Sequence, residues 1–163
     1  MYWYAQIDEN NIVQQVHANV PQGLESTDES GQAYINNVLN LSGTWLKTDF
    51  NTKNGNHYTM IRNLSTNTFS LSADGLPGFR GNFARKGMIY NKEADVFVPL
   101  PEFPSWKLNI TTLKYDPPIP RINDGNWYKW DEANLKWSYI MALSTLQQIV
   151  SENAKKGIFF GQY

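Results

Sequence analysis

The chain has no cysteine and only two histidines among its 163 residues. Without cysteine there are no disulfide bonds, no thiolate zinc sites and no cysteine nucleophiles. No apolar run approaches the roughly 20 residues that a membrane-spanning helix needs, and the first residues lack the basic and apolar regions of a signal peptide. We therefore expect no membrane insertion, and synthesis in a cytoplasm.

Charged residues are scarce as well, at 18% of the chain. The 14 Lys and Arg nearly balance the 15 Asp and Glu, so the formal net charge is -1. Proteins that bind nucleic acid usually carry a surplus of basic side chains that neutralise phosphates. We therefore expect no nucleic-acid partner.

The two histidines belong to no recognisable catalytic or metal-binding pattern. His17 lies in an alternating strand pattern, and His57 lies in a polar stretch with Asp49 as its nearest carboxylate in sequence. Metal binding and acid–base catalysis need side chains that converge, and this spacing brings none together. No serine lies in a nucleophile-elbow motif, and no glycine run resembles a phosphate loop. We predict no catalytic residue, no metal site, no cofactor and no enzymatic activity.

Aromatic residues, in contrast, are abundant at 14%, and many of them lie in a repeated pattern. In residues 90–97, 108–115 and 130–137, an apolar residue precedes Asn or Asp, and a large ring follows seven positions after the first residue. An Asn or Asp just after a strand hydrogen-bonds forward to start a turn, and one near the end of the loop tolerates the left-handed conformation that closes it. Each segment therefore predicts a β-hairpin.

The last of these hairpins carries a ladder of aromatic rings. If Trp130 pairs with Trp137, then Tyr128 pairs with Tyr139, and all four rings share one face. One hairpin rarely buries four large rings by itself, so this face must meet a second sheet, the terminal helix or another chain. Trp45 and Trp106 begin or lie inside alternating strands, and we assign them to the core.

The first 60 residues are less regular. A hairpin is predicted around a turn at residues 8–11, followed by a polar spacer whose acidic cluster we interpret as a solvated linker, since it lacks the spacing of a calcium loop. The cluster consists of Glu25, Asp28 and Glu29. Residues 33–41 fit either a short helix or an irregular strand, and residues 51–56 are expected to form an exposed loop.

After Tyr139 the apolar residues recur at steps of three and four until Gly157, which predicts an amphipathic helix. Its apolar face covers the sheet of its own domain or meets a partner. An apolar tail follows, with Ile158, Phe159, Phe160 and Tyr163. The expected fold is mainly β, with consecutive antiparallel β-hairpins in a domain at residues 1–139 and one C-terminal α-helix with a docking tail at 140–163.

One long segment resembles a known family. "GFRGNFARKGMIYNKEADVFVPLPEFPSWKLNITTLKYDPPIP", followed by "WYKWDEANLKW", is similar to small virion structural proteins of tailed phages that infect marine bacteria, above all cyanobacteria. The motif elements fall on Arg80, Asn82, Phe83, Ala84, Gly87, Tyr90, Phe97, Val98, Pro99, Pro101, Pro104, Ser105 and Trp106. "YAQIDENNIV" and "TWLKTDFNTKNGNHY" extend the likeness over most of the first 139 residues. The chain departs from the family in having "ARKGMIYN" where "AGIGYTYD" is usual, and in its terminal helix and tail.

The resemblance implies a non-enzymatic structural protein of a virion, assembled in the host cytoplasm in symmetric, multiple copies. We expect it at the tail, its fibres or the head–tail neck, with capsid decoration as the alternative position. Its contacts with other virion proteins are predicted at the aromatic hairpin (Tyr128, Trp130, Trp137, Tyr139) and at the tail (Ile158, Phe159, Phe160, Tyr163). Two other functions stay open: a receptor module that stacks a host surface glycan on Trp127, Trp130 and Trp137, and a chaperone for tail-fibre assembly.

Overall fold

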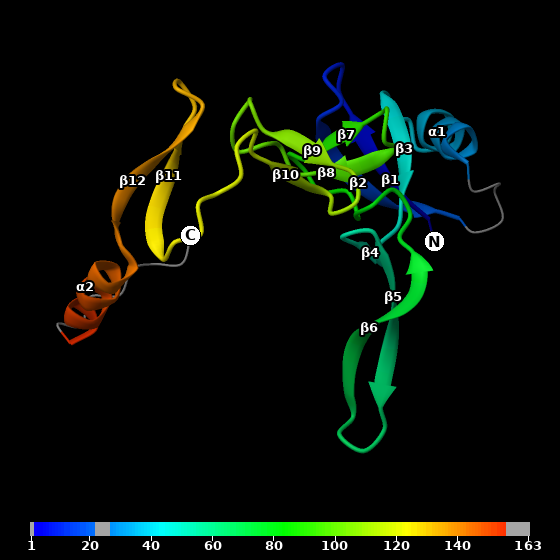
Figure 1. Ribbon diagram of the computed structural model, residues 1–163. Helices are drawn as coiled ribbons and strands as arrows, with labels where there is room; N and C mark the ends of the chain where they lie inside the picture. The colour runs from blue at the N-terminus through cyan, green and yellow to red at the C-terminus, as the bar shows by residue number, and fades with distance from the viewer. Residues whose placement is uncertain (1, 22–26, 156–163) are drawn as a thin grey trace. The chain divides into compact units, whose positions relative to one another are not determined.

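Antiparallel strands are the main regular structure of the computed structural model, which describes residues 2–21 and 27–155 (Figure 1). Helix α2 (Leu143–Lys155) follows the last strand. The predicted fold class, antiparallel hairpins with a C-terminal helix, is confirmed. A second helix, α1 (Asp28–Asn37), is added to it.

The chain divides into two compact units. Unit 1 contains the residues up to Pro101 together with Leu108–Lys114, and unit 2 contains Glu102–Lys107 together with the residues from Tyr115 onward. The predicted division between residues 139 and 140 falls inside strand β12 (Lys136–Ala142). The aromatic hairpin and helix α2 therefore belong to the same unit.

Unit 1 is built on a three-stranded sheet of order β2–β1–β3. The middle strand β1 (Tyr2–Ile7) pairs with β2 (Val13–Val20) and with β3 (Thr44–Thr48). Both faces of β1 are covered, because Tyr4 and Ala5 point to opposite sides and both are fully buried. One core cluster contains Ala5, Ile7, Val13, Ala84 and Phe97, and the other contains Tyr4, Val20, Ile35 and Trp45.

Helix α1 resolves the choice that the sequence left open, but it begins earlier than residue 33, in the polar spacer. Thr27 caps its N-terminus, where the threonine hydroxyl accepts a hydrogen bond from the backbone N–H of Ser30 at 3.2 Å. A Cβ at Gly31 would overlap the Tyr4 ring. Close packing of α1 on the sheet therefore requires glycine at this position.

Unit 1 has a second sheet of order β4–β5–β6. Its strands are β4 (Thr52–Lys53), β5 (Asn56–Asn63) and β6 (Thr68–Pro77). The long β5–β6 hairpin extends away from the β2–β1–β3 sheet (Figure 1), and we call it the arm. The loop expected at residues 51–56 is wrong: Asn54 and Gly55 take φ values of 49° and 77°, which form a tight two-residue hairpin turn between β4 and β5.

The three hairpins predicted from the repeated pattern are all present. They are formed by β7 (Ile89–Asn91) with β8 (Val96–Val98), by β9 (Lys107–Asn109) with β10 (Lys114–Asp116), and by β11 (Asn126–Asp131) with β12. Oδ1 of Asn91, Asn109 and Asp131 accepts a hydrogen bond from a backbone N–H further along each loop, at 2.9, 3.0 and 3.1 Å. The arm uses the same loop, with Asn63 in this place.

The residue that closes each loop in the left-handed conformation was only partly predicted. Asp95 does so with φ 50°, as expected for an Asp or Asn. In the other two loops the closing residues are Leu113 and Leu135, with φ values of 54° and 48°, rather than an Asn or Asp. Leucine has no special tolerance for this conformation, which costs roughly 1 to 2 kcal/mol for a side chain with a Cβ.

Replacing each of these two leucines by asparagine should change the free energy of unfolding in opposite directions. Leu135 is exposed, so we expect Leu135→Asn to raise the free energy of unfolding by about 0.5 to 1 kcal/mol. Leu113 is buried, and a Cβ at Gly81 would crowd its side chain, so Leu113→Asn should lose about 1 to 2 kcal/mol of net stability through lost burial. Urea denaturation of both variants measures the difference, and equal shifts would contradict this account.

Candidate binding surfaces

The aromatic ladder of unit 2 has the predicted register. Trp130 lies opposite Trp137, and Tyr128 lies opposite Tyr139. The ring centroids of the two pairs are 5.3 Å and 5.8 Å apart, with interplanar angles of 70° and 78°. Both pairs therefore have the edge-to-face geometry that aromatic rings favour.

The tryptophan end of the ladder is closed by unit 2 itself. The Trp106 ring lies 6.3 Å from both Trp130 and Trp137, and Phe103 lies 5.2 Å from Trp106. Trp130 is only 6% exposed, whereas Tyr139 is 59% exposed. The connector before β9 thus covers the tryptophan end of the aromatic face, where a second sheet, the terminal helix or another chain was expected. The surface of this face that is left for a partner is the tyrosine end.

Glu132 ties the connector to the hairpin. Its carboxylate accepts hydrogen bonds from the backbone N–H and the hydroxyl of Ser105, at 2.9 and 2.7 Å, and from Nε1 of Trp130 at 2.7 Å. Burial acts to raise the pKa of Glu132, but the hydrogen bonds from Ser105 and Trp130 outweigh it and lower that pKa. This contact was not predicted from the sequence, although Glu132 lies only two residues after Trp130, in the turn directly beyond β11.

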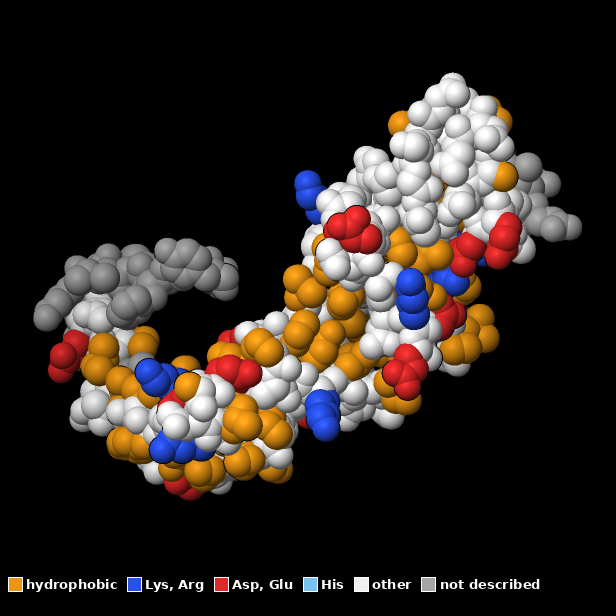
Figure 2. Space-filling model, turned by 90° about the horizontal axis from the view of Figure 1, so that it is seen from above, with side chains coloured by type: hydrophobic (Ala, Val, Ile, Leu, Met, Phe, Trp, Pro, Cys, Tyr) orange, Lys and Arg blue, Asp and Glu red, His pale blue; other side chains and the backbone are white. Residues whose placement is uncertain are grey.

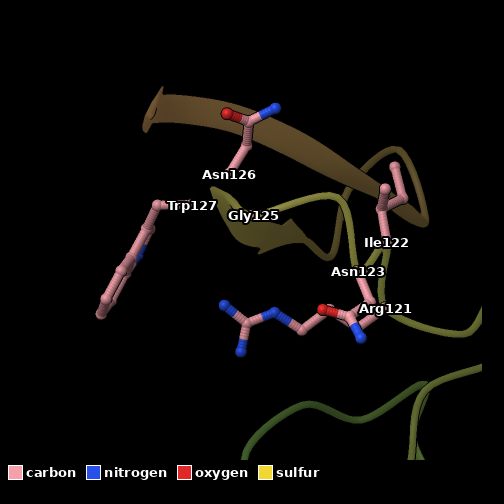
Figure 3. Close-up of a pocket in the computed structure, with 6 residues that line it drawn as sticks. All are labelled: Arg121, Ile122, Asn123, Gly125, Asn126 and Trp127. Carbon is pink, nitrogen blue, oxygen red and sulfur yellow. The ribbon is translucent and has the colours of Figure 1, made fainter. Parts of the chain in front are cut away.

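A shallow hollow opens beside the ladder. It has a volume of about 310 Å³ and is lined by Arg121, Ile122, Asn123, Gly125, Asn126 and Trp127 (Figure 3). Nε1 of Trp137 donates a hydrogen bond to the carbonyl of Ile119 at 2.9 Å, which holds this segment against the hairpin. Figure 2 shows hydrophobic side chains gathered over the β11–β12 part of the surface, with basic side chains between them.

The arm carries an apolar surface that the sequence analysis did not identify. Met60 lies opposite Leu71 in the β5–β6 register, so the two side chains share a face of the arm. They are 64% and 59% exposed, and Leu64 at the tip is also exposed. "NLSTN" at residues 63–67 has the same Asn-first loop as the other hairpins, and this signal was available in the sequence.

The tail was predicted as a second contact surface, and the apolar face of the preceding helix was expected to cover its own sheet or to meet a partner. Ile149 and Val150 of α2 are exposed, so unit 2 leaves part of the apolar stripe uncovered. The predicted tail residues Ile158, Phe159, Phe160 and Tyr163 lie outside the described residues. No helix in the part of the chain that the structure describes is long and apolar enough to span a membrane.

An ion-pair network centred on Arg80 holds unit 1 together. The Arg80 guanidinium donates to both carboxylate oxygens of Asp28 at 2.8 and 2.6 Å, to Asp95 at 2.7 Å and to the carbonyl of Lys47 at 3.0 Å. The side chain of Arg80 is only 11% exposed. The interpretation of Asp28 as part of a solvated linker is therefore wrong, because this carboxylate joins α1 to a segment 52 residues later.

The electrostatics of this network follow from its geometry. Burial opposes the charge of Arg80, but the hydrogen bonds and charges of Asp28 and Asp95 raise its pKa above the ordinary value. Burial also acts to raise the pKa of Asp28, yet the hydrogen bonds from Arg80 and from the backbone N–H of Lys47 lower it overall. Burial and the hydrogen bond that its hydroxyl donates to Asp95 raise the pKa of Tyr90 to about 12.

The structure places two carboxylates beside His57, where the sequence spacing indicated no convergence. Nδ1 of His57 lies 2.6 Å from Asp74 Oδ2, and Nε2 lies 3.8 Å from Asp49 Oδ2. Asp74 lies on the arm, and the sequence offered no signal for its approach. Among residues 2–21 and 27–155, no group of three or more His, Asp or Glu side chains is arranged to hold a metal ion. His17 lies on β2, with its ring 6.3 Å from that of Trp45.

Comparisons of the chain with models of known protein families, with curated proteins and with solved structures found no match.

Proposed function

We propose that the protein is a non-enzymatic structural component of a phage virion that binds neighbouring virion proteins. Its place is the tail, its fibres or the head–tail neck, and decoration of the capsid is the alternative. The basis for the virion is the resemblance of residues 78–120 and 127–137 to the phage family. The support for a binding role is the arm.

Contact with a partner would stabilise the arm. Beyond its base, where β4 pairs with Asn56 and His57, the arm is a two-stranded hairpin, and such a hairpin alone is marginally stable in water. Met60 and Leu71 nevertheless lie exposed on one face of this hairpin, with Leu64 at its tip. Burial of each such side chain contributes roughly 1.5 to 3 kcal/mol, so contact with a neighbouring protein would stabilise both the arm and the assembly.

Particle incorporation tests this function. We expect mass spectrometry of purified virions to find the protein at a fixed copy number, whereas a chaperone would be missing from mature particles. The double substitution Met60→Ser and Leu71→Ser should leave the chain folded and reduce its incorporation at least tenfold. Val38→Ser, which replaces an equally exposed apolar residue away from the arm, is the matched control. Absence from virions, or normal incorporation of the double variant, would refute the proposal.

The tail is the second proposed contact. Deletion of residues 157–163 should leave the hairpins folded, because strand pairing and turn hydrogen bonds within residues 89–142 form them. We expect incorporation of the truncated chain into particles to fall to a similar extent. Burial of the three apolar side chains at 158–160 against a neighbouring protein would contribute several kcal/mol of binding free energy. Unfolding of the truncated chain would show instead that the tail belongs to its own core.

A further inference from the structure

The hollow between residues 121 and 127 has the chemistry of a ligand site. Figure 3 shows the Arg121 guanidinium extending toward the Trp127 indole from the opposite side of the hollow. The amide of Asn123 lies beside Arg121, whereas the side chains of Asn126 and Ile122 turn away. The hollow thus presents a cation, an amide and an aromatic ring.

Arg121 is the cation, and its guanidinium is positioned by an aromatic ring. Its guanidinium carbon lies 5.8 Å from the centroid of the Trp137 ring, over the ring face. Within the described residues, Arg121 makes no hydrogen bond or ion pair. A guanidinium stacked on an aromatic ring keeps its N–H edge free, and that edge matches the two oxygens of a carboxylate.

Trp127 supplies the opposite wall. It is 42% exposed, so its ring is the open aromatic surface that Trp130 and Trp137 do not offer. Trp130 is buried under Trp106, and the Arg121 guanidinium lies over the face of the Trp137 ring. The sugar platform considered from the sequence is therefore reduced to Trp127.

The segment that carries Arg121 and Asn123 is fixed before any ligand arrives. Pro117, Pro118 and Pro120 restrict its backbone, and the hydrogen bond from Trp137 to Ile119 anchors it. The turn into β11 is closed by Asp124, whose Oδ1 accepts from the backbone N–H of Asn126 at 3.0 Å. Gly125 takes φ +79° there. A rigid site loses less conformational entropy when it binds.

We propose that this hollow binds an acidic sugar, with the pyranose ring on Trp127 and its carboxylate on Arg121. The single unpaired cation suits one carboxylate, while a polyphosphate would need a larger basic surface than a chain of net charge -1 provides. Asn123 is placed to bond a sugar hydroxyl. The nearby Asp124 carboxylate is occupied by hydrogen bonds from Asn126 and from the Tyr128 hydroxyl.

Calorimetric titration of the full chain tests this site. The probes are short oligosaccharides of glucuronic acid, galacturonic acid and N-acetylneuraminic acid, with a glucose oligomer of equal length as the neutral comparison. We expect at least one acidic probe to bind at least tenfold more tightly than the neutral one, and this advantage to fall with added salt. Failure of every acidic probe to bind would overturn the proposal.

Three variants assign the binding to this site. Arg121→Gln should abolish the preference for acidic sugar, and Trp127→Ala should weaken both acidic and neutral probes at least tenfold. Trp127→Phe, which retains a ring, should bind within a few-fold of the native chain and serves if Trp127→Ala does not fold. Arg85→Gln removes an exposed positive charge from unit 1 and should change nothing.

Two outcomes of these titrations count against an acidic sugar in this hollow. Unchanged binding in Arg121→Gln or in Trp127→Ala would place the ligand elsewhere. Equal affinity for inorganic phosphate or for a glutamate oligopeptide would show a general anion site. Neither result bears on the virion proposal, because the arm and the hollow are probed by different variants.

Discussion

Arg80→Ala is expected to lower the free energy of unfolding of unit 1 by about 3 kcal/mol or more, because it leaves two carboxylates without their cation. Asp28 would lose both of its bonds from the guanidinium, and Asp95 would lose one. Helix α1 should be affected first, since Asp28 is its first residue. Urea denaturation gives the size of the loss, and hydrogen exchange of residues 28–37 gives its place.

Two control variants distinguish the stability contributed by the hydrogen-bond network from the effect of removing a positive charge. Arg80→Lys keeps the charge but loses the planar fork that bonds both Asp28 oxygens, so it should recover only part of the stability. Arg85→Ala removes an exposed arginine and should have an effect within about 0.5 kcal/mol. If Arg80→Ala lowered the free energy of unfolding no more than Arg85→Ala does, the ion-pair network would contribute little to stability.

The same network gives unit 1 a pH signature. The pKa of Asp28 is lowered in the folded state, so its contribution to stability is present above about pH 4, the ordinary range of Asp, and is lost as pH falls through the folded pKa. The pKa of Tyr90 is raised to about 12, so its contribution is present below the ordinary tyrosine pKa of about 10 and is lost as pH rises from there toward 12. Asp28→Asn should weaken the acid dependence, and Tyr90→Phe should weaken the alkaline one.

Trp106→Ala is expected to lower the free energy of unfolding of unit 2 by about 3 kcal/mol, at the lower end of the usual range for loss of a large core ring. The Trp106 ring contacts Phe103, Trp130 and Trp137, so its removal opens the closed end of the ladder. Ser105 and Glu132 would also be freed from their fixed geometry. Hydrogen exchange of residues 126–142 should rise, while exchange in β1 should stay as in the native chain.

Trp127→Ala is the matched control for this second variant. Trp127 lies on the same hairpin but is half exposed, and no described ring packs against it as Trp106 packs against Trp130. We expect its loss to cost less than half as much stability. If Trp127→Ala were as destabilising as Trp106→Ala, the hollow would be part of the core of unit 2 and not a surface site.

The sequence predicted the hairpins well because their information is local. An Asn or Asp after a strand bonds to backbone a few residues ahead, and the pairing of Trp130 with Trp137 follows from counting residues around such a turn. The assignment of Trp45 to the core is confirmed for the same kind of reason, because alternation along one strand shows which side chains share a face.

The missed features depend on contacts between distant segments. The sequence around Asp28 predicts a solvated residue, because its partner Arg80 lies 52 positions later and no local pattern connects the two. Glu132 meets Ser105 across 27 residues, and His57 meets Asp74 across 17. The left-handed Leu113 was unexpected because its burial beside Gly81 outweighs the preference of the turn for Asn or Asp.

The repeated loop also sets the order in which this chain acquires its structure. Each hairpin closes over a few residues, and such closures take about 1 to 10 μs. The bond between Asp28 and Arg80 instead joins positions 52 residues apart, so a long loop must close before it can form. On a ribosome, Asp28 of α1 therefore lacks this partner until Arg80 has emerged. During that interval α1 depends on the Thr27 cap and on the packing of Ile35 against Tyr4 and Trp45.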